Sequence, residues 1–157
     1  MKTRDIAVLI LCIAMPLIAG GISGALTASA ITDWYAGLVK PSFNPPNYLF
    51  GPVWTTLYVL MGISLYMIYQ SEKSAARSNA LLVFALQLFL NFWWSIFFFS
   101  FQRTDIALAE IALLWLSIVW MIVSFRKIKP VAAYLQIPYL CWVSFASLLN
   151  AAIWTLN

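Results

Sequence analysis

The chain has 157 residues, of which 64% are hydrophobic and only 9% are charged, and its formal net charge is +4. A soluble domain carries about 45–50% apolar and about 25% charged residues. Because so few charges cannot cover a water-exposed surface, the composition indicates an integral membrane protein of one domain. The basic residues lie in short segments between apolar runs, where membrane topology explains them, so we expect no nucleic-acid partner.

Several apolar runs are long enough to cross a bilayer, which takes about 20 residues for about 30 Å of hydrocarbon. They lack the alternation of barrel strands, and an unpaired strand edge is costly in lipid. The short polar breaks between the later runs make neighbouring helices antiparallel. We therefore predict an all-α fold, a single domain over 1–157 with five transmembrane helices at about 6–26, 49–69, 80–101, 106–125 and 131–156.

Residues 34–58, between the first two runs, read WYAGLVKPSFNPPNYLFGPVWTTLY and are rich in proline and aromatic residues. Proline fixes φ and removes a backbone donor, so this segment cannot form one continuous helix. A flexible linker would instead be rich in Gly and Ser. We predict a stiff, folded cap on the membrane surface.

The basic residues are distributed unevenly between the two ends of the predicted bundle. Only Lys40 and Arg103 fall on the side of the cap, and the others fall on the N-terminal side: Lys2, Arg4, Lys73, Arg77, Arg126, Lys127 and Lys129. The positive-inside rule then predicts a multi-pass protein with its N-terminus inside and the cap outside. The first run is too long for the apolar region of a signal peptide, so we expect it to be retained as a helix.

Several kinds of chemistry are excluded by the residues that the chain lacks. It has no histidine, which excludes His-ligated haem, His-rich zinc sites and Ser-His-Asp catalysis. It also lacks the glycine-rich nucleotide-binding motifs. Cys12 and Cys141 both fall within predicted spans, so we expect no structural disulfide.

Polar and aromatic residues recur at helical spacing in three of the predicted spans, and each set shares one face of its helix. The sets are Trp54, Tyr58 and Met61; Gln87, Asn91, Trp94, Ser95 and Phe98; and Pro138, Trp142, Phe145, Ala146, Leu149 and Asn150. One interpretation is contact between helices, with amides bonded across the bundle. The other is a pocket lined by aromatic faces and a few polar groups, which suits a flat apolar ligand.

Two further features lie inside the predicted spans. Glu110 is the one acid well inside a span, and intramembrane acids are functional candidates by default. Since it lies about one turn from a loop, we expect it to reach the interface or to pair with Arg103. Gly20 and Gly24 form a G-x-x-x-G step, which is typical both of close packing within a bundle and of a dimer face.

The motifs resemble those of the tryptophan-rich sensory protein and translocator protein family. The cap pattern is W-Y-x-x-L-x-K-P-x-F-x-P-P followed by G-P-V-W-T-x-L-Y. The third span carries Q-L-F-L-N-F-W-W-S at 87–95, and the chain closes with P-Y-L-C-W-V-S-F-A-S-L-L-N-A-A-I-W-x-L-N at 138–157. The resemblance covers nearly the whole chain and implies five spans with a cap between the first two.

The resemblance implies a membrane receptor or sensor, in a bacterial cell membrane, that binds porphyrins and benzodiazepine-type ligands in a cavity beneath the first loop. Some bacterial members degrade protoporphyrin IX in light, a reaction attributed to two tryptophans that correspond here to Trp54 and Trp142. Several members form homodimers. The alternatives are a transporter of porphyrins or other amphipathic molecules and a scaffold without a ligand. The ligand-binding candidates are Trp34, Tyr35, Pro45, Trp54, Tyr58, Gln87, Asn91, Trp94, Ser95, Trp142, Phe145, Ala146, Leu149 and Asn150.

We expect no cofactor and no metal, because metal-free protoporphyrin IX needs no axial ligand. Its carboxylates would stay near the cap, within reach of Lys40 or Arg103. Membrane lipid is an expected partner. Tight sterol binding is not expected, because the animal members have a basic residue after the closing L-N-Y stretch, and no Lys or Arg follows Asn150 here.

Overall fold

A computed structural model of the protein describes residues 3–157, so Met1 and Lys2, one of the basic residues used for orientation, lie outside it. Over this range the fold is all-α, without strands, and five helices are long and apolar enough to cross a membrane, as predicted. The elements are α1 (Thr3–Ala30), η1 (Ile31–Tyr35), η2 (Asn47–Leu49), α2 (Phe50–Tyr69), α3 (Ala75–Ser95), η3 (Ile96–Ser100), α4 (Thr104–Arg126), α5 (Pro130–Tyr134) and α6 (Ile137–Leu156).

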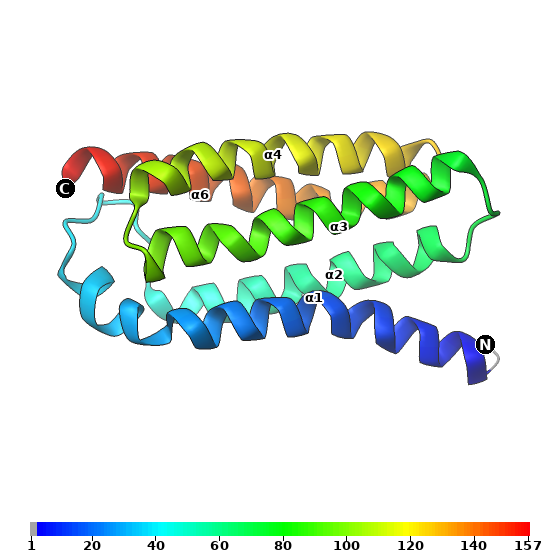
Figure 1. The fold of residues 1–157 in the computed structure, drawn as a ribbon, viewed down its shortest axis with the longest axis horizontal. Helices are drawn as coiled ribbons and strands as arrows, with labels where there is room; N and C mark the ends of the chain where they lie inside the picture. Colours follow the sequence, from blue (N-terminus) through cyan, green and yellow to red (C-terminus); the bar gives the residue numbers. More distant parts are fainter. Residues whose placement is uncertain (1–2) are drawn as a thin grey trace.

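The spans run antiparallel along one bundle (Figure 1). The described N-terminus and the connections after α2 and α4 lie at one end. The connection between α1 and α2, the turn before α4 and the C-terminus lie at the other end. This is the alternation that the distribution of basic residues requires. We call the first end the basic end and the second the cap end.

The first span is longer than predicted, and the cap is correspondingly shorter. The helix continues from α1 through the π-helical turn η1, so Trp34 and Tyr35 belong to the helix rather than to the cap loop. Pro16 lies inside α1 and does not end it. The prolines of the cap act where predicted, since residues 39–46 contain no helix. We use "the cap" for residues 39–46 below.

The fifth span is interrupted, whereas the sequence predicted one continuous helix over 131–156. A short helix, α5, ends at Tyr134, and α6 begins at Ile137 with Pro138 in its first turn. Proline is compatible with the first turn of a helix, where its missing N–H would have no partner, but it disrupts a helix interior. The fully buried Gln136 at the break donates hydrogen bonds to Ser64 Oγ (2.6 Å) and to the Leu60 carbonyl (3.3 Å) on α2.

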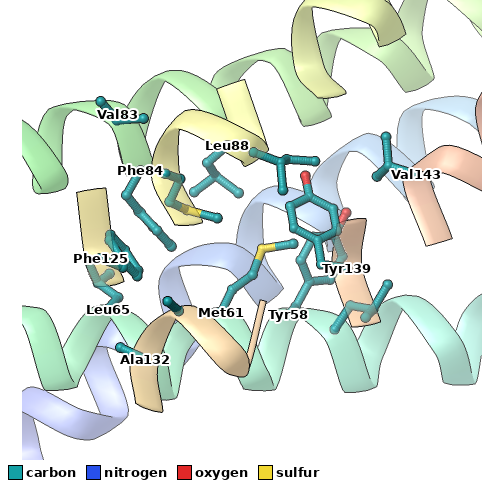
Figure 2. Packing of buried hydrophobic residues seen from close by; sticks show 14 of the residues in the cluster. Tyr58, Met61, Leu65, Val83, Phe84, Leu88, Phe125, Ala132, Tyr139 and Val143 are labelled. Atoms are coloured by element: carbon teal, nitrogen blue, oxygen red, sulfur yellow. The ribbon is translucent and has the colours of Figure 1, made fainter. Parts of the chain in front are cut away.

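The half of the bundle nearer the basic end is filled by apolar side chains. Figure 2 shows Met61, Leu65, Phe84, Phe125 and Ala132 meeting there from α2, α3, α4 and α5. Close approach of α1 to α2 depends on Gly62, because a Cβ at this position would lie 2.8 Å from the Cys12 carbonyl oxygen and against the Ile13 backbone. Small residues permit such contacts between helices in lipid. The main cavity described below lies on the other side of this packed region, toward the cap end.

Candidate functional site

A cavity of about 360 Å³ lies below the cap between α1, α2 and α3. This falls within the range of small-molecule pockets. The α1 wall is made mainly of small residues, and the α2 and α3 walls are mainly aromatic. The lining residues are Leu17, Gly20, Gly21, Ser23, Gly24, Thr27, Ile31, Tyr35, Asn47, Phe50, Gly51, Trp54, Thr55, Tyr58, Asn91, Trp94, Ser95 and Phe99. We call this space the main cavity.

A second, much smaller cavity of about 30 Å³ lies beside the main cavity, toward α6. The two spaces share wall residues, including Trp54 from α2 and Trp94 from α3. From α6 the small cavity receives Trp142, Ala146, Leu149, Asn150 and Ile153. Together the two cavities bring all three predicted stripes to one region of the bundle.

The predicted site residues fall into four groups. The main cavity contains Tyr35, Trp54, Tyr58, Asn91, Trp94 and Ser95. The small cavity adds Trp142, Ala146, Leu149 and Asn150. Phe145 lines a lipid-facing groove between α2 and α6. Three predicted residues line none of these spaces: Trp34, whose ring packs edge-on against Phe98; Pro45, in the cap; and Gln87, which is buried below the main cavity.

The floor of the main cavity is a chain of hydrogen bonds between side chains of three helices. The Tyr58 hydroxyl donates to Asn91 Oδ1 (2.8 Å), and Asn91 Nδ2 donates to the Tyr139 hydroxyl (3.1 Å). The Tyr139 hydroxyl donates to Gln87 Oε1 (2.9 Å). All four residues are buried. The amides of Gln87 and Asn91 therefore bond across the bundle, which is one of the two roles considered for them. Asn91 also lines the cavity, which is the other.

Aromatic rings form the walls above this floor. Trp54 stacks on Tyr58 with ring centroids 5.4 Å apart, and it meets Tyr139 edge-on at 6.2 Å. Trp142 does not stack on Trp54; its ring neighbours are Phe50 at 5.8 Å and Phe145 at 5.6 Å. The two tryptophans of the expected reaction thus line one small cavity, with Phe50 also in its wall.

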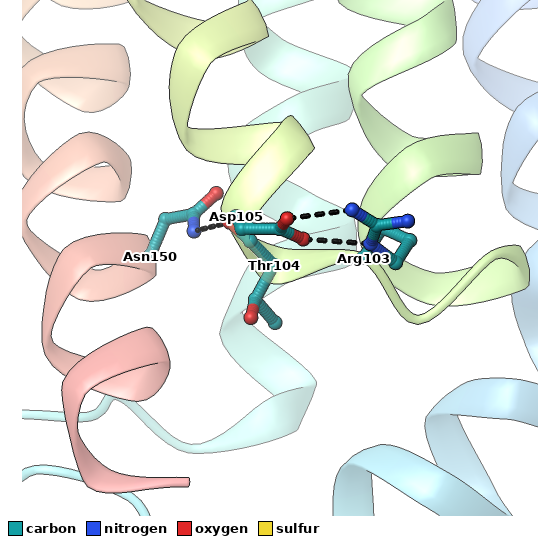
Figure 3. Close-up of polar contacts among 4 residues, drawn as sticks. All are labelled: Arg103, Thr104, Asp105 and Asn150. Carbon is teal, nitrogen blue, oxygen red and sulfur yellow. Dashed lines mark hydrogen bonds and ion pairs between the residues drawn. The ribbon is translucent and has the colours of Figure 1, made fainter.

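At the cap end, polar contacts hold the turn between η3 and α4. Arg103 makes a bidentate ion pair with Asp105 (2.7 and 2.9 Å), and this hydrogen bonding raises the pKa of Arg103 further above its ordinary value (Figure 3). Asn150 Nδ2 donates to the Thr104 carbonyl (2.8 Å), and Asn150 Oδ1 accepts from Trp94 Nε1 (3.2 Å). Arg103 is therefore engaged locally by Asp105.

Lys40, the other cation expected near a ligand, also has local partners. Its ammonium donates to the Ala36 carbonyl (3.1 Å) and to the Leu38 carbonyl (3.2 Å). It also lies over the Tyr35 ring, 4.8 Å from the centroid. Lys40 thus covers the end of the first span next to a wall residue of the main cavity.

The expected pairing of Glu110 with Arg103 is wrong, because Arg103 pairs with Asp105. Glu110 is buried on α4, and neither carboxyl oxygen has a hydrogen-bond partner within residues 3–157. Since α4 begins at Thr104, Glu110 lies nearly two turns inside the helix.

The sequence analysis missed the α1 wall and Tyr139. Gly20, Gly24 and Thr27 recur at spacings of three and four, which was the available signal for a face of small residues. A Cβ on Gly20 would collide with the Tyr58 ring, so this glycine makes room for a wall residue of the same bundle. A Cβ on Gly24 would meet nothing within 4 Å. Tyr139 carried no signal apart from its place in the closing motif.

This arrangement can bind a flat molecule but offers few groups for acid–base chemistry. Its walls provide indole and phenol faces, and its floor provides an amide–hydroxyl pair. Aromatic rings favour offset stacking or edge-on contact with other π systems. Indole N–H groups and Asn91 can orient polar atoms of a ligand.

Comparisons with known proteins agree with this architecture. The sequence profile described as "TspO/MBR family" matches residues 12–155. A tryptophan-rich protein TspO of Chlorobaculum tepidum is 41% identical over 98% of each chain, and one of Archaeoglobus fulgidus is 43% identical over 91% of this chain and 93% of its own. The translocator protein of Homo sapiens is 37% identical over 79% of this chain and 75% of its own. With the profile matching nearly the whole of a five-helix membrane bundle, this chain belongs to the TspO/MBR family.

Proposed function

We propose that the protein is a membrane receptor or sensor that binds protoporphyrin IX and similar flat apolar molecules in the main cavity. The main support for this proposal is the stacking of Trp54 on Tyr58, above the hydrogen bond from Tyr58 to Asn91. The ring faces suit a planar π system, and the floor supplies a polar anchor. The name of one related chain, tryptophan-rich sensory protein, agrees with a sensory role, and the name of another, translocator protein, agrees with the alternative of transport.

The filled basic half of the bundle favours a receptor over the alternative, a transporter. Below the floor of the cavity, Met61, Ile68, Phe84 and Phe125 are almost fully buried. A transporter would have to open this packed region to release a ligand at the basic end. A flux assay in protein-containing vesicles tests the alternative directly, since a receptor predicts binding without transfer of porphyrin to the far side.

Light-dependent oxidation of the bound porphyrin is the second part of the proposal. Trp54 lines both cavities and Trp142 lines the small one, so a porphyrin stacked on Trp54 in the main cavity would have two readily oxidised indoles on adjoining walls. An excited porphyrin with dioxygen as the oxidant would react there, shielded from bulk water. Metal-free protoporphyrin IX fits this donor set because the reaction needs no axial ligand from the protein.

We also propose a bacterial cell membrane with the N-terminus inside, and a homodimer. The orientation follows from the excess of Lys and Arg at the basic end, and the bacterial membrane is proposed from the resemblance to bacterial members of the family. For the dimer, the exposed Gly24 belongs to a G-x-x-x-G step on α1 that permits close approach of a second chain, and Gly24 also lines the main cavity. Gly24→Leu should shift the protein toward monomer in detergent, and an unchanged dimer would place the interface on another helix.

Titration with protoporphyrin IX tests the proposed function. Purified protein in detergent or nanodiscs should show saturable quenching of tryptophan fluorescence in the dark, and illumination should then consume the porphyrin. Tyr58→Phe combined with Asn91→Leu removes the polar anchor and should weaken the saturable binding. Quenching that rises linearly with porphyrin concentration, in wild type and variant alike, would reduce the interaction to partition into the detergent or lipid.

A further inference from the structure

An apolar groove on the lipid-facing surface lies between α2 and α6. Its volume is about 570 Å³, and its walls include Thr56 and Leu60 from α2 and Cys141 and Trp142 from α6. The groove exists because α2 packs mainly against α1, α3 and α5, whereas α6 packs mainly against α4. Between these two helices the bundle is therefore open toward the hydrocarbon of the membrane.

Trp142 separates this groove from the interior. It lines the groove on one side and the small cavity on the other. The small cavity in turn shares Phe50, Trp54 and Trp94 with the main cavity. A path from the bilayer through the groove and the small cavity to the main cavity is thus interrupted at the Trp142 ring.

Trp142 lacks the indole hydrogen bond that holds two other half-buried tryptophans in place. Trp94 donates its indole N–H to Asn150 (3.2 Å), and Trp115 donates to Ser144 (2.8 Å). The Trp142 N–H is buried without a hydrogen-bond partner among residues 3–157. No hydrogen bond of its N–H therefore has to break when the ring rotates, and the ring is retained by apolar packing, which includes contacts with Phe50 and Phe145.

The cap, by contrast, is held to the helices by several hydrogen bonds and an aromatic contact. Asn157 bonds both backbone groups of Val39, accepting from its N–H (3.0 Å) and donating to its carbonyl (3.0 Å). The Tyr35 hydroxyl donates to Asn44 (2.8 Å) inside the cap. Phe43 of the cap packs edge-on against Phe145 of α6, with centroids 6.3 Å apart. Entry from the aqueous side would have to break several of these contacts.

We infer that the groove between α2 and α6 is the entrance through which an apolar planar ligand leaves the bilayer, and that Trp142 is its gate. The inference rests on the proposed function, because it assigns a route to the same cavity. An apolar ligand is concentrated in the hydrocarbon, so a lateral entrance avoids transfer through water. Rotation of the Trp142 ring would join the groove to the small cavity, and its return would enclose the ligand.

Two exposed groove residues allow the entrance to be clamped. In a Cys12→Ala background, Thr56→Cys places a second thiol across the groove from the native Cys141. A short bis-methanethiosulfonate reagent would bridge α2 and α6, and reductant would release the bridge. Binding of protoporphyrin IX is then followed in the dark by stopped-flow tryptophan quenching, before and after reduction. The matched control carries only Cys141, modified with methyl methanethiosulfonate.

The clamp should slow both association and dissociation by about tenfold or more and leave the equilibrium affinity within about twofold, because a gate changes the barrier in both directions equally. Reductant should restore both rates. Unchanged rates in the clamped protein would overturn the inference while leaving the proposed function intact. A clamp that lowers affinity instead would make the groove part of the binding site and also overturn it. Failure of the reduced protein to bind porphyrin at all would refute the proposed function itself.

Discussion

The Tyr58 hydroxyl donates a 2.8 Å hydrogen bond to Asn91, and this bond both joins α2 to α3 and forms the floor of the main cavity. One contact therefore serves stability and the site together. The sequence analysis treated contact between helices and ligand binding as alternatives for these residues. In the bundle they are compatible, because Asn91 uses its amide for Tyr58 and Tyr139 while its side chain remains in the cavity wall.

The first prediction concerns this bond. Tyr58→Phe leaves Asn91 Oδ1 buried without its donor, which should lower the free energy of unfolding by about 1–3 kcal/mol. Denaturant or thermal unfolding in detergent measures the change. Tyr66→Phe is the matched control, because its hydroxyl only accepts a hydrogen bond from the exposed Gln70 side chain. Equal stability of the two variants would mean that the bond from Tyr58 to Asn91 contributes little.

Two glycines of one motif should respond differently to the same change. Gly20→Ala places a methyl group against the Tyr58 ring and should destabilise the protein by about 1–3 kcal/mol while displacing a wall of the main cavity. Gly24→Ala meets open space and should be neutral or slightly stabilising, since alanine is the better helix former. Unfolding of both variants under the same conditions tests the contrast. Similar losses for both would contradict the packing of α1 against α2.

Much of this fold could be predicted because the bilayer restricts what a chain can do. Apolar runs give the spans, and the basic residues give their alternation. The break before Pro138 escaped prediction because proline is compatible with both an interior kink and a helix start, and only the bonds of Gln136 to α2 decide between them. Extension of the first helix to Tyr35 was missed because Asp33 and the aromatic residues looked like the beginning of the cap.

The part of the candidate site that could be predicted is the part in which aromatic and amide residues recur at helical spacing along one helix. The stripe of Trp54 and Tyr58 and that of Asn91 and Trp94 do meet in one cavity. The α1 wall was missed because the G-x-x-x-G step of Gly20 and Gly24 was interpreted as a contact between helices and not as the wall of a cavity. The pairing of Arg103 with Asp105 rather than Glu110 depends on a tight turn in which Gln102 adopts a positive φ of 54°, and no spacing rule indicates this.

For Glu110, the buried acid on α4, we predict a substitution that raises stability. Both Glu110 carboxyl oxygens are buried without partners in the part of the chain that the structure describes, so this side chain costs stability whichever protonation state it adopts. Glu110→Leu should therefore raise the free energy of unfolding, by about 1 kcal/mol or more. Asp105→Asn is a useful comparison, since it weakens an exposed ion pair and should change the free energy of unfolding only slightly. A marked loss of stability in Glu110→Leu would show that the carboxyl group has a partner when the protein is in its membrane.

Membrane topology can be tested with two single cysteines. Ser74, at the start of α3, lies at the basic end, and Ser42 lies in the cap. In a background lacking Cys12 and Cys141, Ser74→Cys and Ser42→Cys should react with an impermeant thiol reagent from opposite faces of the membrane. The positive-inside rule predicts that Ser42→Cys reacts in intact cells and Ser74→Cys only after lysis. Reaction of both in intact cells would refute the arrangement of five spans.

The tryptophans of the small cavity separate binding from chemistry. Trp142→Phe keeps an aromatic face against Phe50 but removes the oxidisable indole, so light-dependent loss of protoporphyrin IX should fall far more than affinity does. Trp54→Ala removes the ring stacked on Tyr58 and should weaken both, because stacking on an aromatic side chain is worth roughly 1–3 kcal/mol per ring in nucleic-acid complexes.

Absorbance of the porphyrin under constant illumination gives the rate, and dark titration gives the affinity. Trp120→Phe, on the exposed face of α4, is the matched control for losing one indole outside the site. If the double variant Trp54→Phe/Trp142→Phe consumes porphyrin in light as fast as wild type, neither indole takes part in the reaction, and the proposal reduces to binding alone.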